Sequence, residues 1–136
     1  MRKWETRVAL RLTLKPHERV ILGGAVLRNG GSRVDLLIEN RVPVLRGADI
    51  LSPSAVHTPC ERIYLALQLM YVDPGQASQY REMLRSLVAE VLEAAPSCRR
   101  LIEQMESLIA ADQLYQGLKV TRKLIEHERE LMSHVR

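Results

Sequence analysis

The chain has 136 residues, with 20 Lys and Arg against 16 Asp and Glu, so its formal net charge is +4. This length suits one domain, or one small domain with an appendage, and 46% hydrophobic residues with 26% charged residues argue against intrinsic disorder. No apolar run approaches the roughly 18–20 residues of a membrane span, and the first residues lack the apolar stretch of a secretory signal, so we expect a cytoplasmic protein without a membrane partner.

In the first part of the chain apolar and polar residues alternate, which is the pattern of half-buried strands. A first strand is expected to turn one set of side chains inward: Val8, Leu10, Leu12 and Leu14. Further strands are expected at 19–22, 25–28, 33–39 and 42–46, with Val34, Leu36 and Ile38 inward in the fourth. These are about five short antiparallel strands, too small a sheet to be stable without a partner sheet or helices over its apolar face.

Turn residues separate these strands. Pro16 indicates a turn at 15–18, and Gly23-Gly24 allows a bend or bulge. The stretch Asn29-Gly30-Gly31-Ser32 predicts a tight hairpin, because Asn and Gly tolerate the positive φ that such turns require. Pro43 places the last strand at a sheet edge, since proline cannot donate a ladder hydrogen bond.

From residue 58 onward the sequence predicts helices. Thr58-Pro59-Cys60-Glu61 is a capping box with proline at the first helical position, and Asp73-Pro74-Gly75-Gln76 repeats the device for a second helix that ends before Pro96. A third helix is expected at about 97–111, and Asp112 is expected to cap the last one. The last helix is expected to carry one shared face: Leu114, Leu118, Thr121, Ile125, Glu128 and Met132.

The predicted fold class is α+β, with an antiparallel β module at 1–52 followed by a domain of about four helices at 53–136. Positive charge is concentrated in the first part, which carries ten Lys and Arg against five Asp and Glu. A locally basic module indicates a polyanionic partner such as nucleic acid, or otherwise a solvated strand face.

Sites for catalysis or metal binding are not evident. The sequence has no phosphate-binding loop of P-loop or dinucleotide type, no HExxH and no nucleophile elbow. Its four histidines are scattered, and Cys60 and Cys98 are isolated, as expected of reduced, partly buried thiols. We therefore expect no enzyme, no metal, no cofactor and no small-molecule substrate.

Several stretches, in this order, resemble one known family: TLKPHER, GAVLRNG, LLIEN followed by PVLRGADIL, TPCERIYLALQLMYVDP and YQGLKVTRKLIEHE. They resemble the FlbT family of flagellin-synthesis regulators over residues 8–131. The resemblance implies binding to the 5′ untranslated region of flagellin mRNA, repression of its translation and promotion of its decay. It also implies coupling to the regulator FlaF and to flagellin. Some family members activate flagellin synthesis instead, so both signs of regulation stay open.

The β module also resembles, more distantly, the carbon storage regulator. Leu12-Thr13, Glu18, Leu22-Gly23 and Val26 are similar to its opening strands, and the ending Val42-x-Val44-x-Arg46 to its fifth strand. That regulator is an interlocked dimer whose fifth strand grips GGA-containing RNA together with the first strand of a partner subunit. The resemblance implies a homodimer through the β module. The first-strand arginine of the carbon storage regulator, however, corresponds to Leu14 in this sequence.

Two functions from different classes stay open. In the first, the protein is an RNA-binding regulator, and its candidate RNA contacts are Arg46, Val44, Arg11, Lys15, Arg28, Arg33 and Arg41. In the second, it is a protein-binding adaptor or chaperone-like factor acting on flagellin or FlaF. The candidate partner-binding residues are Arg62, Arg122 and Lys123, for which structural ion pairs are an equal alternative. The basic β module favours the first function, and the lack of sheet aromatics for base stacking favours the second.

Overall fold

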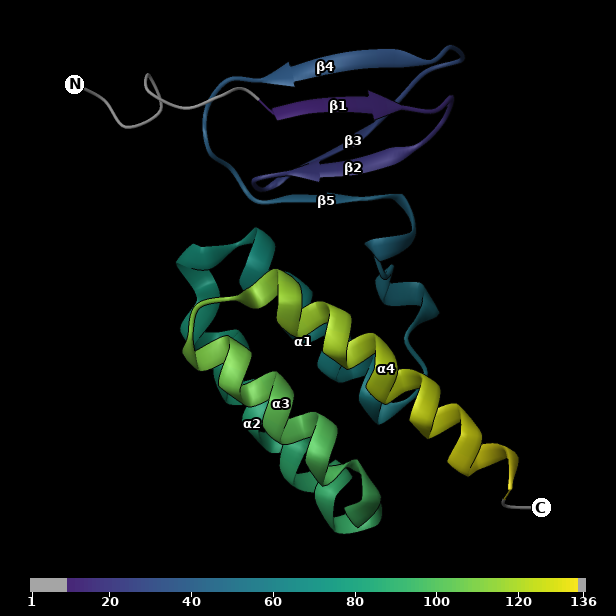
Figure 1. Ribbon diagram of the computed structural model, residues 1–136, viewed down its shortest axis with the longest axis vertical. Helices are drawn as coiled ribbons and strands as arrows, with labels where there is room; N and C mark the ends of the chain where they lie inside the picture. The colour runs from purple at the N-terminus through teal and green to yellow at the C-terminus, as the bar shows by residue number, and fades with distance from the viewer. Residues whose placement is uncertain (1–9, 135–136) are drawn as a thin grey trace. The chain divides into compact units, whose positions relative to one another are not determined.

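The computed structural model describes residues 10–134, which divide into two compact units, one ending at Ile50 and one beginning at Leu51 (Figure 1). We call them the β unit (10–50) and the helical unit (51–134). The fold class is α+β, as predicted: the described residues form five antiparallel strands and then four helices. The predicted division into a basic β module at 1–52 and a helical domain at 53–136 stays a prediction.

The five strands of the β unit form two small antiparallel sheets rather than one (Figure 1). The first sheet pairs β1 (Leu10–Leu14) with β4 (Val34–Ile38). The second has the order β3 (Ala25–Arg28), β2 (Arg19–Leu22), β5 (Val44–Arg46). Strand β5 therefore lies at an edge, as Pro43 predicted.

Apolar side chains of both sheets form the core of the β unit. Leu12, Leu14 and Val20 are buried, and the partly buried side chains packed against them are Leu22, Leu36, Ile38 and Val44. The predicted alternation is therefore correct in the middle of the strands. It is wrong for Leu10, which is 48% exposed, and for Val34, which is 36% exposed, because the first sheet has only two strands and its ends are poorly covered. Val8 lies outside the described residues.

The tight hairpin of the β unit lies at Gly23-Gly24, not at residues 29–32 as predicted. Leu22 pairs with Ala25 across a two-residue loop, and Gly23 has φ +61°, a conformation that glycine adopts without a Cβ clash. Residues 29–32 instead carry the chain from β3 in one sheet to β4 in the other. The sequence pattern could not show this, because turn residues indicate a change of direction and not which strands pair.

The helical unit contains α1 (Pro59–Val72), α2 (Ala77–Ala94), α3 (Arg99–Ala110) and α4 (Leu114–Ser133). Helix α1 packs against α2 and α4, and α3 packs against α4. The largest fully buried side chains of this unit are Ile63, Leu67, Met70, Ile102, Met105, Leu118 and Leu124. These seven are all leucine, isoleucine or methionine side chains. None of the helices in residues 10–134 is long and apolar enough to cross a lipid bilayer.

The first predicted cap is confirmed and the two later ones are wrong. The Thr58 hydroxyl accepts from the Glu61 amide at 3.2 Å while the Glu61 side chain accepts from the Thr58 amide at 3.1 Å. Asp73 makes no such bond, and a short 3-10 turn at 74–76 precedes α2. Asp112 has φ +58° and its amide donates to the Ile109 carbonyl, so it ends α3 in the left-handed conformation common after helices rather than beginning α4.

Candidate nucleic-acid interface

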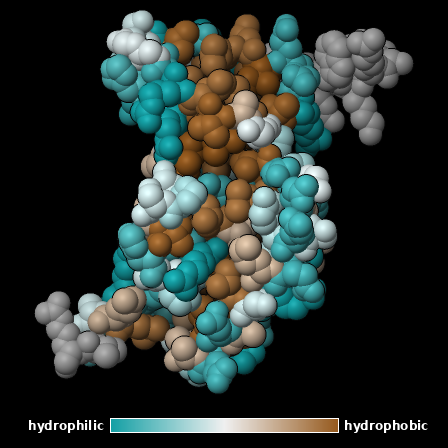
Figure 2. Space-filling model, turned by 180° about the vertical axis from the view of Figure 1, so that it is seen from behind, coloured by the Kyte–Doolittle hydropathy of each residue, from teal (hydrophilic) through white to brown (hydrophobic). Residues whose placement is uncertain are grey.

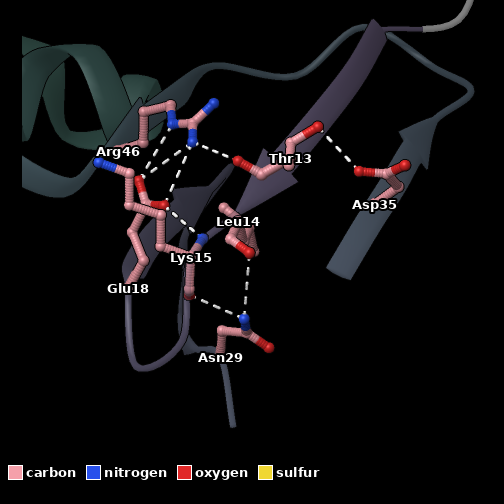
Figure 3. A network of polar contacts seen from close by, with 7 residues as sticks. All are labelled: Thr13, Leu14, Lys15, Glu18, Asn29, Asp35 and Arg46. Carbon is pink, nitrogen blue, oxygen red and sulfur yellow. Dashed lines mark hydrogen bonds and ion pairs between the residues drawn. The ribbon is translucent and has the colours of Figure 1, made fainter. Parts of the chain in front are cut away.

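Arg46 joins the two sheets of the β unit (Figure 3). Its Nε donates to Glu18 Oε2 at 3.2 Å, and its Nη2 donates to Glu18 Oε1 at 3.2 Å and to the Thr13 carbonyl. Thr13 lies in β1 of the first sheet and Arg46 in β5 of the second. The guanidinium is therefore part of the structural framework, with 38% of its side chain still exposed.

Glu18 is the acceptor at the centre of this network. Its side chain is only 15% exposed, and besides Arg46 it accepts the Lys15 amide at 2.9 Å. The hydrogen bonds from Arg46, then that from Lys15, hold the pKa of the Glu18 carboxyl below its ordinary value of 4.5. Gly47 lies directly beside it: its φ is +49°, and a Cβ there would lie 3.2 Å from Glu18 Oε2. The close approach of this loop to the carboxylate therefore requires glycine.

Asn29 holds the crossing between the sheets. Its Nδ2 lies 2.8 Å from the Lys15 carbonyl, 2.9 Å from that of Ser32 and 3.3 Å from that of Leu14, so its two hydrogens are shared among three acceptors. Its Oδ1 accepts the Gly30 amide at 2.8 Å. The amide thus ties the turn after β1 to the segment that leads into β4.

A second polar cluster lies on the outer face of the first sheet. Asp35 accepts from the Thr13 hydroxyl at 2.8 Å and from the Arg11 guanidinium at 3.0 Å. The Thr13 hydroxyl first, and then Arg11, lower the pKa of the Asp35 carboxyl. Arg33 adds a weaker charge interaction with the same carboxylate. Two of the predicted RNA contacts, Arg11 and Arg33, therefore both favour the charged form of the Asp35 carboxyl.

The predicted RNA-contact residues differ in exposure. Five of them are exposed on the β unit: Arg11, Lys15, Arg28, Arg33 and Arg41. Arg28 also donates to the His17 carbonyl at 3.1 Å, so part of its guanidinium holds the β2–β3 end. Val44 is half-buried and packs against the core, so its side chain serves the fold. Arg46 bonds to both sheets, and part of its side chain is still accessible.

The predicted partner-binding residues are all exposed on the helical unit. Arg122 donates to the Tyr64 hydroxyl at 3.1 Å, and its guanidinium lies 5.2 Å from the centroid of that ring. Tyr64 itself is 2% exposed and belongs to the core with Leu67 and Met70. Lys123 lines a surface pocket near the start of α4.

Comparison with known proteins identifies the family. The family model for "Flagellar protein FlbT" matches residues 10–132. The chain belongs to the FlbT family. A FlbT protein of Bradyrhizobium diazoefficiens, named a probable flagellum biosynthesis repressor, is 42% identical over 125 residues, covering 91% of this chain and 85% of that relative. The FlbT repressor of Caulobacter vibrioides is 35% identical over 128 residues, covering 93% of this chain and 91% of that protein.

A FlbT protein of Rhodopseudomonas palustris, also named a probable flagellum biosynthesis repressor, is 39% identical and is covered over 98% of its length. No solved structure matches the chain. The distant resemblance of the β module to the carbon storage regulator therefore stays a prediction.

Sequence reasoning missed the residues that organise the β unit and one surface of the helical unit. Glu18 and Asn29 carry no pattern that marks them as network centres, because the partners that join separate segments, Arg46 for Glu18 and Lys15 for Asn29, are 28 and 14 residues away in the sequence. Tyr115 and Lys119 had a usable signal: they are four residues apart on α4, so their side chains meet on one helix face.

Proposed function

We propose that this protein is a post-transcriptional repressor of flagellin synthesis, which binds the 5′ untranslated region of flagellin mRNA, represses its translation and promotes its decay. The relatives' names support the repressor role in flagellum biosynthesis. The observation that carries the RNA-binding step is the set of exposed cations on the β unit: Arg11, Lys15, Arg28, Arg33 and Arg41.

These cations are attached to a scaffold whose turns are fixed by hydrogen bonds. Lys15 lies in the turn held by Glu18 and Asn29, and Arg11 is oriented by Asp35. The Arg11 guanidinium is thereby partly ordered before it meets a phosphate, and an ordered side chain loses less conformational entropy on binding. Arg46 can join them, because its bonds to Glu18 and Thr13 use Nε and Nη2, and a guanidinium has a second terminal nitrogen.

The test must separate a contact role of Arg46 from its structural role. We would titrate the full chain with flagellin leader RNA and with a scrambled RNA of the same length, at several salt concentrations. Arg46→Ala removes both the cation and the pair with Glu18, whereas Glu18→Gln weakens the pair and keeps the cation. Direct contact predicts weaker leader binding for Arg46→Ala and retained binding for Glu18→Gln. Equal losses would assign Arg46 to the framework alone.

The exposed cations have their own test. Replacing Arg11 and Arg33 with Gln should weaken binding and lower the salt dependence, by about 0.7 in the log–log slope for each phosphate contact removed. Failure of the wild-type chain to prefer the leader over scrambled RNA would overturn direct recognition.

A second function has support in the apolar surface of the β unit. Val26 is 61% exposed and Leu37 is 67% exposed, and Figure 2 shows apolar side chains gathered over this unit. None of the strands in the described residues carries an aromatic ring for base stacking. These observations favour a protein-binding adaptor or chaperone-like factor for flagellin or FlaF, with an indirect effect on the message. Leader binding that appears only after flagellin or FlaF is added would select this function.

A homodimer through the β module is part of the same proposal. Each of the two small sheets has edge strands, and an edge strand can pair with a strand of a second chain. Light scattering at working concentration measures the oligomeric state directly, and a monomer would exclude the dimer.

A further inference from the structure

The helical unit carries a surface pocket whose side chains suit a nucleotide. It lies among the end of α1, the end of α3 and the first turns of α4, and its volume is about 750 Å³. This is within the roughly 300–1,000 Å³ range of small-ligand sites. The residues that matter for its chemistry are Tyr71, Tyr115, Lys119, Lys123, Gln113 and Gln116.

Two tyrosine rings form one wall of the pocket. The ring centroids of Tyr71 and Tyr115 are 6.0 Å apart with an interplanar angle of 40°, and both side chains are half-buried. Packing therefore restricts the rings while part of each remains accessible. Restricted, accessible rings are the surfaces on which proteins stack unpaired bases, whatever the base sequence.

Cations lie beside these rings. The Lys119 ammonium is 5.0 Å from the Tyr115 ring centroid, and Lys123 follows one helical turn later on the same side of α4. A base that stacks on Tyr115 can take the place of the ammonium, which is then near the phosphate of the same nucleotide. Asp112 is the acidic residue in the pocket lining, so the lining carries more positive than negative charge.

The amide groups at the rim complete the set. Gln113 and Gln116 are exposed, and each amide offers both a donor and an acceptor, as the edge of a base requires. A groove for an amphipathic protein helix would need a continuous apolar floor instead. Rings, ammonium groups and amides at one place fit a nucleotide better than a helix.

We propose that this pocket binds single-stranded RNA, with a base stacked on the tyrosine pair and phosphates at Lys119 and Lys123. The proposal rests on the proposed RNA-binding function and adds a second contact region to it, on the helical unit. It supplies the aromatic stacking that the described strands of the β unit lack.

The first experiment compares two charge-matched double variants of the full chain. Lys119→Gln with Lys123→Gln removes two cations at the pocket, and Arg99→Gln with Arg100→Gln removes two exposed cations at the other end of α3. The probes are flagellin leader RNA and an unstructured RNA of ten nucleotides. Two lost phosphate contacts should lower the salt slope by about 1.4 and weaken binding about 25-fold at 0.1 M salt. Equal losses of RNA affinity in the two double variants would overturn the proposal that the pocket binds RNA.

The second experiment concerns stacking. Tyr115→Phe keeps the ring and should retain binding, whereas Tyr115→Leu should weaken it roughly 10-fold. Circular dichroism and thermal unfolding identify any variant that fails to fold. If Tyr115→Leu does not fold, Tyr115→Phe still tests whether RNA contacts the ring without the help of its hydroxyl. If folded Tyr115→Leu binds RNA as well as Tyr115→Phe does, the proposal that a base stacks on Tyr115 is wrong.

The outcomes separate this proposal from the proposed function. Leader binding by the wild type that is insensitive to the pocket variants overturns the pocket and leaves the function standing. Pocket-dependent binding of the ten-nucleotide RNA without leader preference supports the pocket and contradicts the function. Loss of flagellin binding, with RNA binding unchanged, would make the pocket a protein site and overturn the proposal.

Discussion

Arg46 and Glu18 form an ion pair of 3.1 Å with two hydrogen bonds, although they lie 28 residues apart in the sequence. The same guanidinium donates to the Thr13 carbonyl in the other sheet. The residue expected to meet RNA is thus also the one that ties the two sheets together. A loss of RNA binding in Arg46→Ala alone would not separate these roles.

Breaking this pair should destabilise the β unit. Glu18→Gln is expected to lower the free energy of unfolding by about 1–2 kcal/mol, a value reduced for the partial exposure of Arg46. Unfolding by guanidinium chloride measures this free energy. The matched control is Arg11→Gln, which breaks an ion pair with 70% and 50% exposed side chains and should lower the free energy of unfolding much less than Glu18→Gln does. Equal effects would show that the network is not structural.

Stability should fall in acid, in part through Glu18. Its pKa is held below 4.5 in the folded protein, so the folded state binds this proton less readily than the unfolded state does. The resulting stabilisation is fully present above pH 4.5 and is lost as the pH falls through the folded pKa. Unfolding titrations at pH 7 and at about pH 3 should show a smaller loss for Glu18→Gln than for the wild type. Identical losses would exclude Glu18 as a contributor.

Gly47→Ala should destabilise the protein by about 1–3 kcal/mol. The position has φ +49°, which strains an L-residue, and the new Cβ would lie 3.2 Å from Glu18 Oε2. Gly31→Ala is the control, since no atom lies within 4 Å of a Cβ there, and its effect should stay within about 0.5 kcal/mol. Similar unfolding midpoints for the two variants would contradict the close approach.

The capping box of α1 should be measurable in the helical unit. Thr58→Ala removes the acceptor for the Glu61 amide and is expected to destabilise by about 1 kcal/mol, whereas Thr58→Ser keeps a hydroxyl and should be close to the wild type. Thermal unfolding followed by circular dichroism compares the three proteins. Should the alanine and serine variants unfold together, the cap contributes nothing.

The two thiols should be unreactive in the native protein. Cys60 and Cys98 are each 1% exposed, more buried than the sequence indicated, and are not disulfide-bonded. Burial first, and then the Glu128 carboxylate, raises the pKa of both thiols, which keeps them protonated. Ellman's reagent at pH 8 should react slowly with native protein and quickly with both thiols in guanidinium. Rapid reaction of one thiol in the native state would contradict its burial.

Sequence patterns predicted the structure correctly where it depends on contacts between residues close together in the sequence. The Thr58–Glu61 cap, the edge position of β5 and the buried faces of the helices follow from residues a few positions apart. They failed at Asp112 and at residues 29–32, where a residue suited to one role serves another. Asp112 ends α3 instead of beginning α4, and Asn29 holds a crossing between sheets instead of a hairpin.

By itself, the sequence determined the α+β class, the approximate position of all five strands and four helices, and the family to which the chain belongs. Alternation and helical period are short-range properties, so they survive without knowledge of the fold. Only the tertiary structure decided that the strands divide into two sheets, that Glu18 holds Arg46, and that Tyr71 meets Tyr115. Each of these depends on which distant segments pair, and packing of the whole unit sets that pairing rather than any local preference.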